Sequence, residues 1–409
     1  MDTPVQLNRN HLIWHLYRSG FVLLLLGFLW SCGTAPSDTT PKTKSPPKTS
    51  TQNPKDKVPS ELTLPGLTYT LQRPFSKELP LHPKGESTAI PNEYPTRTVK
   101  VERRLPFRGI TMSCPRAGAI WATEGMRTNM AEVQQLGSNW ITFHPYARVY
   151  RDGSLRFDTS TNQSTVMTPM RYKKELGMKI MLKPHIAYWG SGFSWRGAIV
   201  FKEEAHWQRF FNDYTRWMVV QAKMAQAGGA EIFSMGLEYK LMEHREEDWR
   251  KVIAAVRKVY KGKILYSANW DTYDKVKFWD ALDYIGIQAY FPISQKTDPS
   301  EEELVQGWKK VLTTLEKFSN QHKKPIIFTE LGYNYSAQAA AKPWDYQQGG
   351  PNAGAIKLRC MKVALEQLHK PKFIHGVFLW KWFPDSRISS RDFILQYPEM
   401  KKVISNAWK

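Results

Sequence analysis

The stretch Pro325-Ile-Ile-Phe-Thr-Glu330-Leu-Gly-Tyr333 joins a short apolar run to a carboxylate at its end, followed by a glycine. An earlier stretch, Ile232-Phe-Ser-Met-Gly-Leu-Glu238-Tyr, also joins an apolar run to a carboxylate, with the glycine before it. Apolar runs of this length are typical of parallel strands that are buried on both faces. If both runs are strands of one parallel barrel, Glu238 and Glu330 lie at the same open end of it.

The same alternation of short apolar runs and amphipathic segments continues on both sides of these stretches. Eight runs are expected to be strands: 107–112, 140–144, 179–184, 231–235, 264–268, 284–289, 325–329 and 374–380. Helical periodicity predicts helices over 125–136, 204–227, 246–260, 301–322 and 353–369. Eight strand and helix units in this order predict an α/β fold, a (β/α)8 TIM barrel, over residues 107–409.

The N-terminal part has a different composition. Basic residues precede the apolar run Phe21–Trp30, which predicts a signal peptide over residues 1–31. The junction Leu29-Trp-Ser-Cys32 resembles a bacterial lipobox, in which the cysteine is lipidated, so Cys32 is the expected lipidation site. An uncleaved N-terminal anchor is the alternative. Residues 32–59 predict a Pro/Thr/Lys-rich linker, and 60–106 a short N-terminal extension.

These segments predict an exported lipoprotein, anchored to a bacterial membrane in the cell envelope, and leave the choice of membrane open. The net charge of +21 would suit nucleic acid, but the basic residues are scattered and no nucleic-acid motif accompanies them. We therefore expect no nucleic-acid partner. Cys114 and Cys360 lie far apart and indicate neither a disulfide scaffold nor a zinc site. No cofactor or metal is expected, because no motif for either is present.

The predicted strand ends are rich in side chains that bind sugars. Aromatic rings stack on the C–H faces of pyranoses, and amides, carboxylates and imidazoles bind their hydroxyl groups. The residues at these ends are His144, Tyr146, His185, Tyr188, Trp189, Glu238, Tyr239, Asn269, Trp270, Gln288, Tyr290, Glu330, Tyr333, Trp380 and Trp382. Two facing carboxylates are also what acid-assisted glycosidic cleavage requires.

With these motifs in this order, the chain resembles glycoside hydrolase family 113. The segments that carry the resemblance are Arg108-Gly-Ile-Thr-Met112, Gly236-Leu-Glu238, Tyr284-Ile-Gly-Ile-Gln-Ala-Tyr290, Phe328-Thr-Glu330-Leu-Gly-Tyr333 and Trp380-Lys-Trp382. The resemblance implies a retaining (β/α)8 glycosidase, chiefly a β-1,4-mannanase, with Glu238 as acid/base and Glu330 as nucleophile.

The resemblance also suggests how other residues act. It implies that Tyr290 hydrogen-bonds the nucleophile and that Trp380 is the platform under the sugar at the cleavage point. Many relatives in the wider clan have Asn just before the acid/base, whereas this chain has Leu237 there. Family 113 also tends to lack that Asn, so Leu237 is consistent with the resemblance. The remaining expected substrate-binding residues are His185, Asn269, Trp189 and Tyr333.

Three functions remain open from the sequence. The first is a retaining endo-glycosidase that cleaves a β-linked hexose polysaccharide, with β-1,4-mannan as the default substrate. The second is a glycosidase that uses Glu238 and Glu330 on another β-glycan. Loops around the site determine which glycan binds, and the motifs do not specify these loops. The third is a non-catalytic glycan-binding lipoprotein of the envelope. Both glutamate motifs favour the enzymes.

Overall fold

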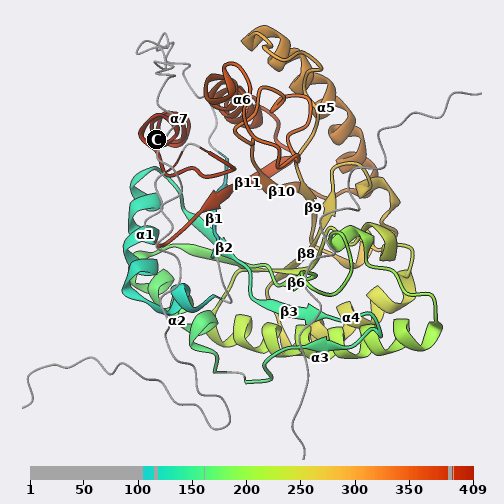
Figure 1. Cartoon of the computed structure of the whole chain (residues 1–409). Helices are drawn as coiled ribbons and strands as arrows, with labels where there is room; N and C mark the ends of the chain where they lie inside the picture. The colour runs from blue at the N-terminus through green and yellow to red at the C-terminus, as the bar shows by residue number, and fades with distance from the viewer. Residues whose placement is uncertain (1–104, 115–117, 161, 386–388, 390) are drawn as a thin grey trace, which may run out of the picture. The chain divides into compact units, whose positions relative to one another are not determined.

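The barrel predicted from the alternating apolar runs is present in the computed structural model, which describes residues 105–114, 118–160, 162–385, 389 and 391–409. Its strands form a closed parallel ring in the order β1-β11-β10-β9-β8-β7-β5-β2 (Figure 1). The ring consists of β1 (Phe107–Met112), β2 (Trp140–Phe143), β5 (Lys179–Leu182), β7 (Ile232–Leu237), β8 (Lys263–Asn269), β9 (Tyr284–Gln288), β10 (Ile326–Leu331) and β11 (Ile374–Trp382). The predicted (β/α)8 TIM barrel and all eight predicted strands are confirmed.

Helices surround this ring (Figure 1). They are α1 (Glu124–Gln135), α2 (Ser164–Leu176), α3 (Glu204–Gly228), α4 (Glu246–Val259), α5 (Glu301–His322), α6 (Ala353–Leu368) and α7 (Pro398–Trp408). Each buries one face, as in α4, where Trp249, Val252 and Val256 are buried against the strands. The five predicted helices are confirmed. The sequence reading had missed α2, which contains Pro169, and the C-terminal α7.

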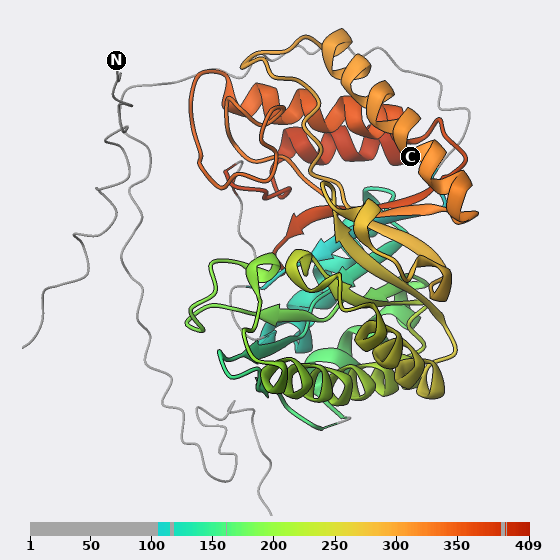
Figure 2. The same cartoon turned by 90° about the vertical axis from the view of Figure 1, so that its right-hand side faces the viewer.

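The inside of the barrel is filled near the N-terminal ends of the strands. Six buried side chains form this plug: Trp140, Met181, Ile232, Leu265, Ile327 and Phe378. Gly109 is required beside it, because a Cβ atom there would come within 2.2 Å of the Phe378 ring. A packed interior leaves only the C-terminal ends of the strands for binding. The strand arrows point to this end, on the left of Figure 2, where the loop after β10 projects.

Two prolines change the path of the chain at this open end. Pro145 and Pro184 follow β2 and β5, and because proline has no N–H group, it cannot continue a ladder of hydrogen bonds. The chain then forms a small second sheet of β3 (Tyr146–Val149), β4 (Leu155–Arg156) and β6 (His185–Ala187). The sequence reading had not identified this sheet, whose strands are too short for a periodicity argument.

The N-terminal predictions lie outside the described residues. They comprise the signal peptide over 1–31, lipidation of Cys32, the linker over 32–59 and all but the last two residues of the extension over 60–106. In the part of the chain that the structure describes, no helix is both long enough and apolar enough to cross a membrane.

Candidate active site

Glu330 is the next-to-last residue of strand β10, and both of its carboxylate oxygens accept hydrogen bonds. Lys183, one residue beyond β5, donates from Nζ to Oε1 at 2.5 Å, and Tyr290 donates from its hydroxyl to Oε2 at 2.8 Å. The side chain is only 5% exposed, and that of Lys183 is fully buried. Burial lowers the pKa of Lys183, and the negative charge of Glu330 opposes that shift. Two donors therefore hold the Glu330 carboxylate in one orientation.

Glu238 follows strand β7 in a very different setting. Arg196 donates from Nη1 to Oε2 of Glu238 at 3.0 Å. Burial raises the pKa of the Glu238 carboxyl, the guanidinium of Arg196 opposes this shift, and the charge of Glu330 adds to it. A raised pKa favours a carboxyl group that can retain a proton and deliver it.

The backbone of Glu238 is strained. Its φ is 58°, in the left-handed region that residues with a Cβ atom avoid. Such a conformation costs on the order of 1–3 kcal/mol and persists only where surrounding contacts impose it. One contact is the hydrogen bond from the Glu238 N–H to the carbonyl of Ser267, at 3.0 Å, which fixes the end of β7 against β8.

Further contacts hold the residues after Glu238. The Tyr239 N–H donates to the Tyr266 hydroxyl at 3.2 Å, and this hydroxyl donates to Oε1 of Glu243 at 3.2 Å. Lys240 forms an ion pair with Asp271 in the loop after β8, at 2.7 Å. Strand β8 and its loop therefore position the segment that carries Glu238.

Two stacked histidines lie beside the carboxylates. The rings of His144 and His185 are 4.4 Å apart and nearly parallel, at 15°. Burial lowers the pKa of both rings well below the ordinary value, so both are neutral near pH 7. His185 Nδ1 lies 3.5 Å from Nη2 of Arg196, and the Trp380 ring lies 5.6 Å from that of His144. Neutral imidazoles offer both a donor and an acceptor to a hydroxyl group.

The other predicted substrate-binding residues are placed as follows. Tyr290 and Trp380 are buried in one aromatic cluster with Phe393. Asn269 ends β8 and lies in register with Gln288 at the end of β9. Trp189 is on the loop after β6, where 49% of it is exposed and its ring lies 5.4 Å from that of Tyr146. All four residues lie at the open end of the barrel.

Tyr333 is not brought together with these four residues. This residue is 2% exposed and belongs to the main hydrophobic core. Burial raises the pKa of its hydroxyl, and its interaction partners are Cys360 on α6 and Trp308 on α5. Gly332 follows the strand, and the chain then turns toward the outer helices, so Tyr333 packs between layers. Tyr239 and Trp382, also in the set of strand-end aromatics, are likewise fully buried core residues.

The sequence reading missed two residues that contact the carboxylates, Lys183 and Arg196. A lysine directly after Lys179-Ile-Met-Leu should have been a signal, because a lysine buried in a strand needs a charged partner. Arg196 gave no such signal. It lies beyond β6, at the start of a short 3-10 helix over Arg196–Ala198, and only the fold brings it to Glu238.

Within the described residues, no group of three or more His, Cys, Asp or Glu side chains is arranged to hold a metal ion. The side chains described above at the open end comprise two carboxylates, two cations, two imidazoles and several aromatic rings. This set can transfer protons, provide a nucleophile and bind a hydroxylated, C–H-rich ligand.

Comparison with solved structures supports this description of the fold. A β-1,4-mannanase of glycoside hydrolase family 113 is 24% identical with a TM-score of 0.65, over 74% of this chain and 99% of the other. The family 113 β-mannanase of Alicyclobacillus acidocaldarius, in complex with ManMIm, is 24% identical with a TM-score of 0.64, over 75% and 97%. A β-glucuronidase of Ruminococcus gnavus is 10% identical with a TM-score of 0.52, over 75% and 50%.

A comparison with curated proteins gave no match. A comparison with family models matches residues 111–391 to glycoside hydrolase family 113. This match covers the barrel from β1 to the segment beyond β11, including both carboxylates and the cations that contact them. The chain belongs to glycoside hydrolase family 113 and is a glycoside hydrolase.

Proposed function

We propose that the protein is a retaining endo-β-1,4-mannanase in which Glu330 is the nucleophile and Glu238 the general acid/base. The observation that carries this assignment is the contrast between the two carboxylates. Glu330 is held by a lysine and a tyrosine hydroxyl, while burial raises the pKa of Glu238. A retaining glycosidase requires one ionised carboxylate and one carboxyl that holds a proton.

The reaction takes two steps. Glu330 forms a bond to the anomeric carbon as the glycosidic C–O bond breaks, and Glu238 gives its proton to the departing oxygen. Glu238 then takes a proton from water, the water oxygen bonds to the anomeric carbon, and the bond to Glu330 breaks. Lys183 and Tyr290 orient Glu330 and stabilise its charge when it leaves in the second step.

The substrate is a β-linked hexose polymer. Trp380, beside the two histidines, provides the ring on which the sugar at the cleavage point stacks, and the exposed Trp189 binds a further sugar. His185 and Asn269 bind hydroxyl groups. Mannan is the proposed polymer because the family 113 structures that share the fold are β-mannanases.

The experiment is release of reducing sugar from glucomannan, galactomannan and β-glucans by the wild type, Glu238→Gln and Glu330→Gln. Glu247→Gln, an exposed glutamate on α4, is the matched control. We expect mannan cleavage by the wild type and the control, with loss in both site variants. Preferential cleavage of a β-glucan would show that the substrate is a β-glucan and not mannan. No release from any polymer would overturn the proposal.

We also propose that Cys32 is lipidated and anchors the enzyme in the cell envelope. The support is the basic and apolar leader that ends in Leu29-Trp-Ser-Cys32. Fractionation of cells that express the full chain tests this proposal. The wild type is expected in the membrane fraction and Cys32→Ala outside it in mature form, and membrane retention of an unlipidated Cys32→Ala chain would favour an uncleaved anchor.

A further inference from the structure

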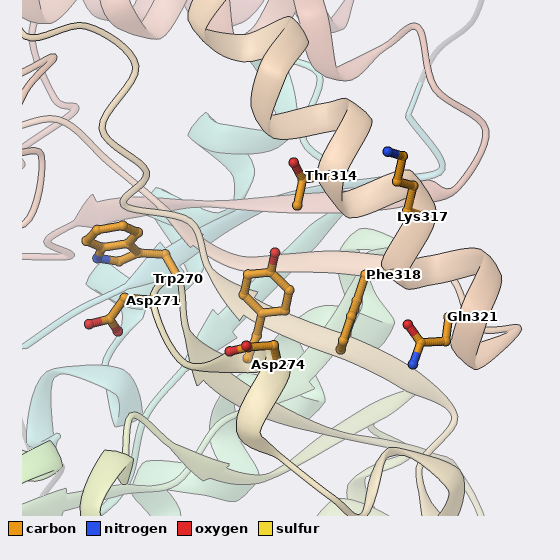
Figure 3. Close-up of a pocket in the computed structure, with 8 residues that line it drawn as sticks. Trp270, Asp271, Asp274, Thr314, Lys317, Phe318 and Gln321 are labelled. Carbon is orange, nitrogen blue, oxygen red and sulfur yellow. The ribbon is translucent and has the colours of Figure 1, made fainter.

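A groove outside the catalytic centre lies between the loop after β8 and helix α5 (Figure 3). It encloses about 410 Å³, within the range of small-ligand sites. Its lining residues are Trp270, Asp271, Tyr273, Asp274, Thr314, Lys317, Phe318 and Gln321. Four of them come from α5, with Thr314 nearer the Trp270 end and Gln321 at the opposite end.

The lining combines the two types of group that bind sugars. Three aromatic residues, Trp270, Tyr273 and Phe318, supply apolar surface, and Tyr273 meets Phe318 edge to face with ring centroids 4.9 Å apart. Acidic, basic, amide and hydroxyl side chains surround these rings. The side chains of Lys317 and Gln321 are exposed and make no hydrogen bond or ion pair with any residue that the structure describes, so both are available to a ligand.

The groove is continuous with the open end of the barrel through Trp270. This residue directly follows Asn269 and packs against the aromatic cluster that contains Tyr290 and Trp380. Trp344, from the loop after β10, stacks on Trp270 with centroids 5.0 Å apart and an angle of 20°, and it remains 41% exposed. The stacked pair forms an aromatic ledge between the catalytic residues and the groove.

The groove is also joined to the segment that carries Glu238. Asp271 lines the groove and forms the ion pair with Lys240, two residues after Glu238. One side of the groove is therefore fixed relative to the catalytic centre. A ligand of fixed repeat length can occupy both places only if their separation does not vary, and this ion pair restricts it.

We propose that this groove binds outlying sugar units of the same β-linked polysaccharide whose cleavage point lies at Glu238 and Glu330. The proposal rests on the proposed function and extends it, because it makes the enzyme favour long chains over short oligosaccharides. The polymer crosses the ledge of Trp270 and Trp344 and enters the groove. Tyr273 and Phe318 contact its C–H faces, and Lys317 and Gln321 bind its hydroxyl groups.

The test fills the groove without disturbing the core. Thr314 is exposed on α5 and lines the groove, so Thr314→Trp places a large ring within it. Thr313→Trp is the matched control. Thr313 is also exposed, and its hydroxyl donates to the carbonyl four residues earlier, as that of Thr314 does, but Thr313 does not line the groove. Both changes are made in the otherwise unaltered chain and in the Glu330→Gln background.

Two measurements are compared. Affinity electrophoresis of the Glu330→Gln proteins in galactomannan gives polymer binding, and hydrolysis of an aryl β-mannobioside, too short to reach the groove, gives catalysis. We expect Thr314→Trp to weaken polymer binding about fivefold or more, the effect of losing one stacked sugar ring and its hydrogen bonds. Its rate of hydrolysis of the short substrate should be unchanged. Thr313→Trp should match the parent in both assays.

Equal polymer binding by the Thr314→Trp and Thr313→Trp proteins would overturn the groove proposal and leave the proposed function intact. A wild type that neither cleaves nor binds mannan would overturn both. Equal loss of short-substrate hydrolysis and polymer binding in Thr314→Trp would also contradict the proposal, because it would place the effect at the catalytic centre.

Discussion

Glu330 and Glu238 are the same residue type at the ends of two strands of one barrel, yet their surroundings differ. Glu330 lies within strand β10, and a lysine and a tyrosine bind its two oxygens. Glu238 lies after the end of β7 in a left-handed conformation, with Arg196 on one oxygen. Neighbours from other elements, and not the residue type, therefore set the charge and the orientation of each carboxyl group.

The two cations also differ in how they reach their partners. Lys183 belongs to the barrel wall and is fully buried, so its position is as rigid as that of the strand. Arg196 comes from a loop, and its guanidinium also donates to the carbonyl of Ile186 at 3.2 Å and lies 5.7 Å from the Tyr188 ring. In the proposed mechanism, the first cation holds the nucleophile in place, and the second adjusts the protonation of the acid.

The largest expected effect comes from deleting each carboxyl in turn. Glu330→Ala should lower kcat on mannan on the order of 10⁵-fold, because no covalent intermediate can form. Glu238→Ala should lower it about 10²–10⁴-fold, with little loss on a dinitrophenyl glycoside, whose leaving group needs no proton.

Added azide should yield the α-glycosyl azide with Glu330→Ala and the β-glycosyl azide with Glu238→Ala, identified by NMR. Exchanged products would reverse the assigned roles.

The next largest effect concerns the lysine in the barrel wall. Lys183→Met removes one donor from buried Glu330, and we expect kcat to fall on the order of 10²-fold with a smaller change in KM. Lys179→Met, at the exposed start of β5, the strand that precedes Lys183, is the control and should retain near wild-type kcat. Steady-state kinetics on one mannan measures both variants, and an unaltered kcat in Lys183→Met would show that Glu330 does not depend on this donor.

Removal of the arginine should change the pH dependence. The charge of Arg196 lowers the pKa of Glu238 and opposes the effect of burial, so Arg196→Gln should raise that pKa further. The alkaline limb of kcat/KM, which reports loss of the acid's proton, should move to higher pH by about one unit. Arg209→Gln, whose partner is the surface residue Asp152, should leave the limb in place. A move to lower pH would contradict the assignment of Glu238 as the acid.

The smallest expected effect on activity concerns a third carboxyl, Glu243, behind the Glu238 segment. Burial raises its pKa from an ordinary 4.5 to about 8, with Asp271 adding to the shift and Tyr266, Thr272 and Lys240 opposing it. The folded protein therefore keeps a proton that the unfolded chain has lost, and stability falls as the pH rises from about 4.5 to about 8, at ~1.4 kcal/mol per unit of pKa difference.

Glu243→Gln cannot titrate and should lack this fall. Urea denaturation at pH 5 and pH 9 measures it: the free energy of unfolding of the wild type should decrease relative to that of the variant by several kcal/mol, on the scale of ~1.4 kcal/mol per unit. The variant should keep kcat within a few-fold, because the amide oxygen can still accept from Tyr266. Parallel stability changes in the two proteins would show that Glu243 is not protonated in the folded state.

Local sequence predicted the features that depend on short stretches. The runs ending in Glu238 and Glu330 could be read as parallel strands because burial on both faces requires apolar residues throughout. The helix predicted over 301–322 begins at Glu301, where the structure shows a capping box of Ser300 with Glu303. Tyr290 was found because a strand end in a parallel barrel faces the open end.

The differences between the sequence predictions and the structure have one physical cause. Tyr333 was assigned to the open end from its place after β10, but its ring packs between the strand and helices α5 and α6. A position after a strand does not specify which way the chain turns. Lys183 and Arg196 were missed because contacts between residues distant in the chain leave no trace in local composition. The small sheet formed after Pro145 and Pro184 was missed because two- to four-residue strands carry no period.

Apolar periodicity and two short motifs were thus sufficient for the barrel, its strand order and the two carboxylates, because burial and backbone geometry act over a few consecutive residues. The protonation of those carboxylates, the direction of Tyr333 and the groove beside Trp270 depend on side chains that meet only after the ring of strands closes. Electrostatic interaction and packing act through space, so the folded chain, and not its local order, sets them.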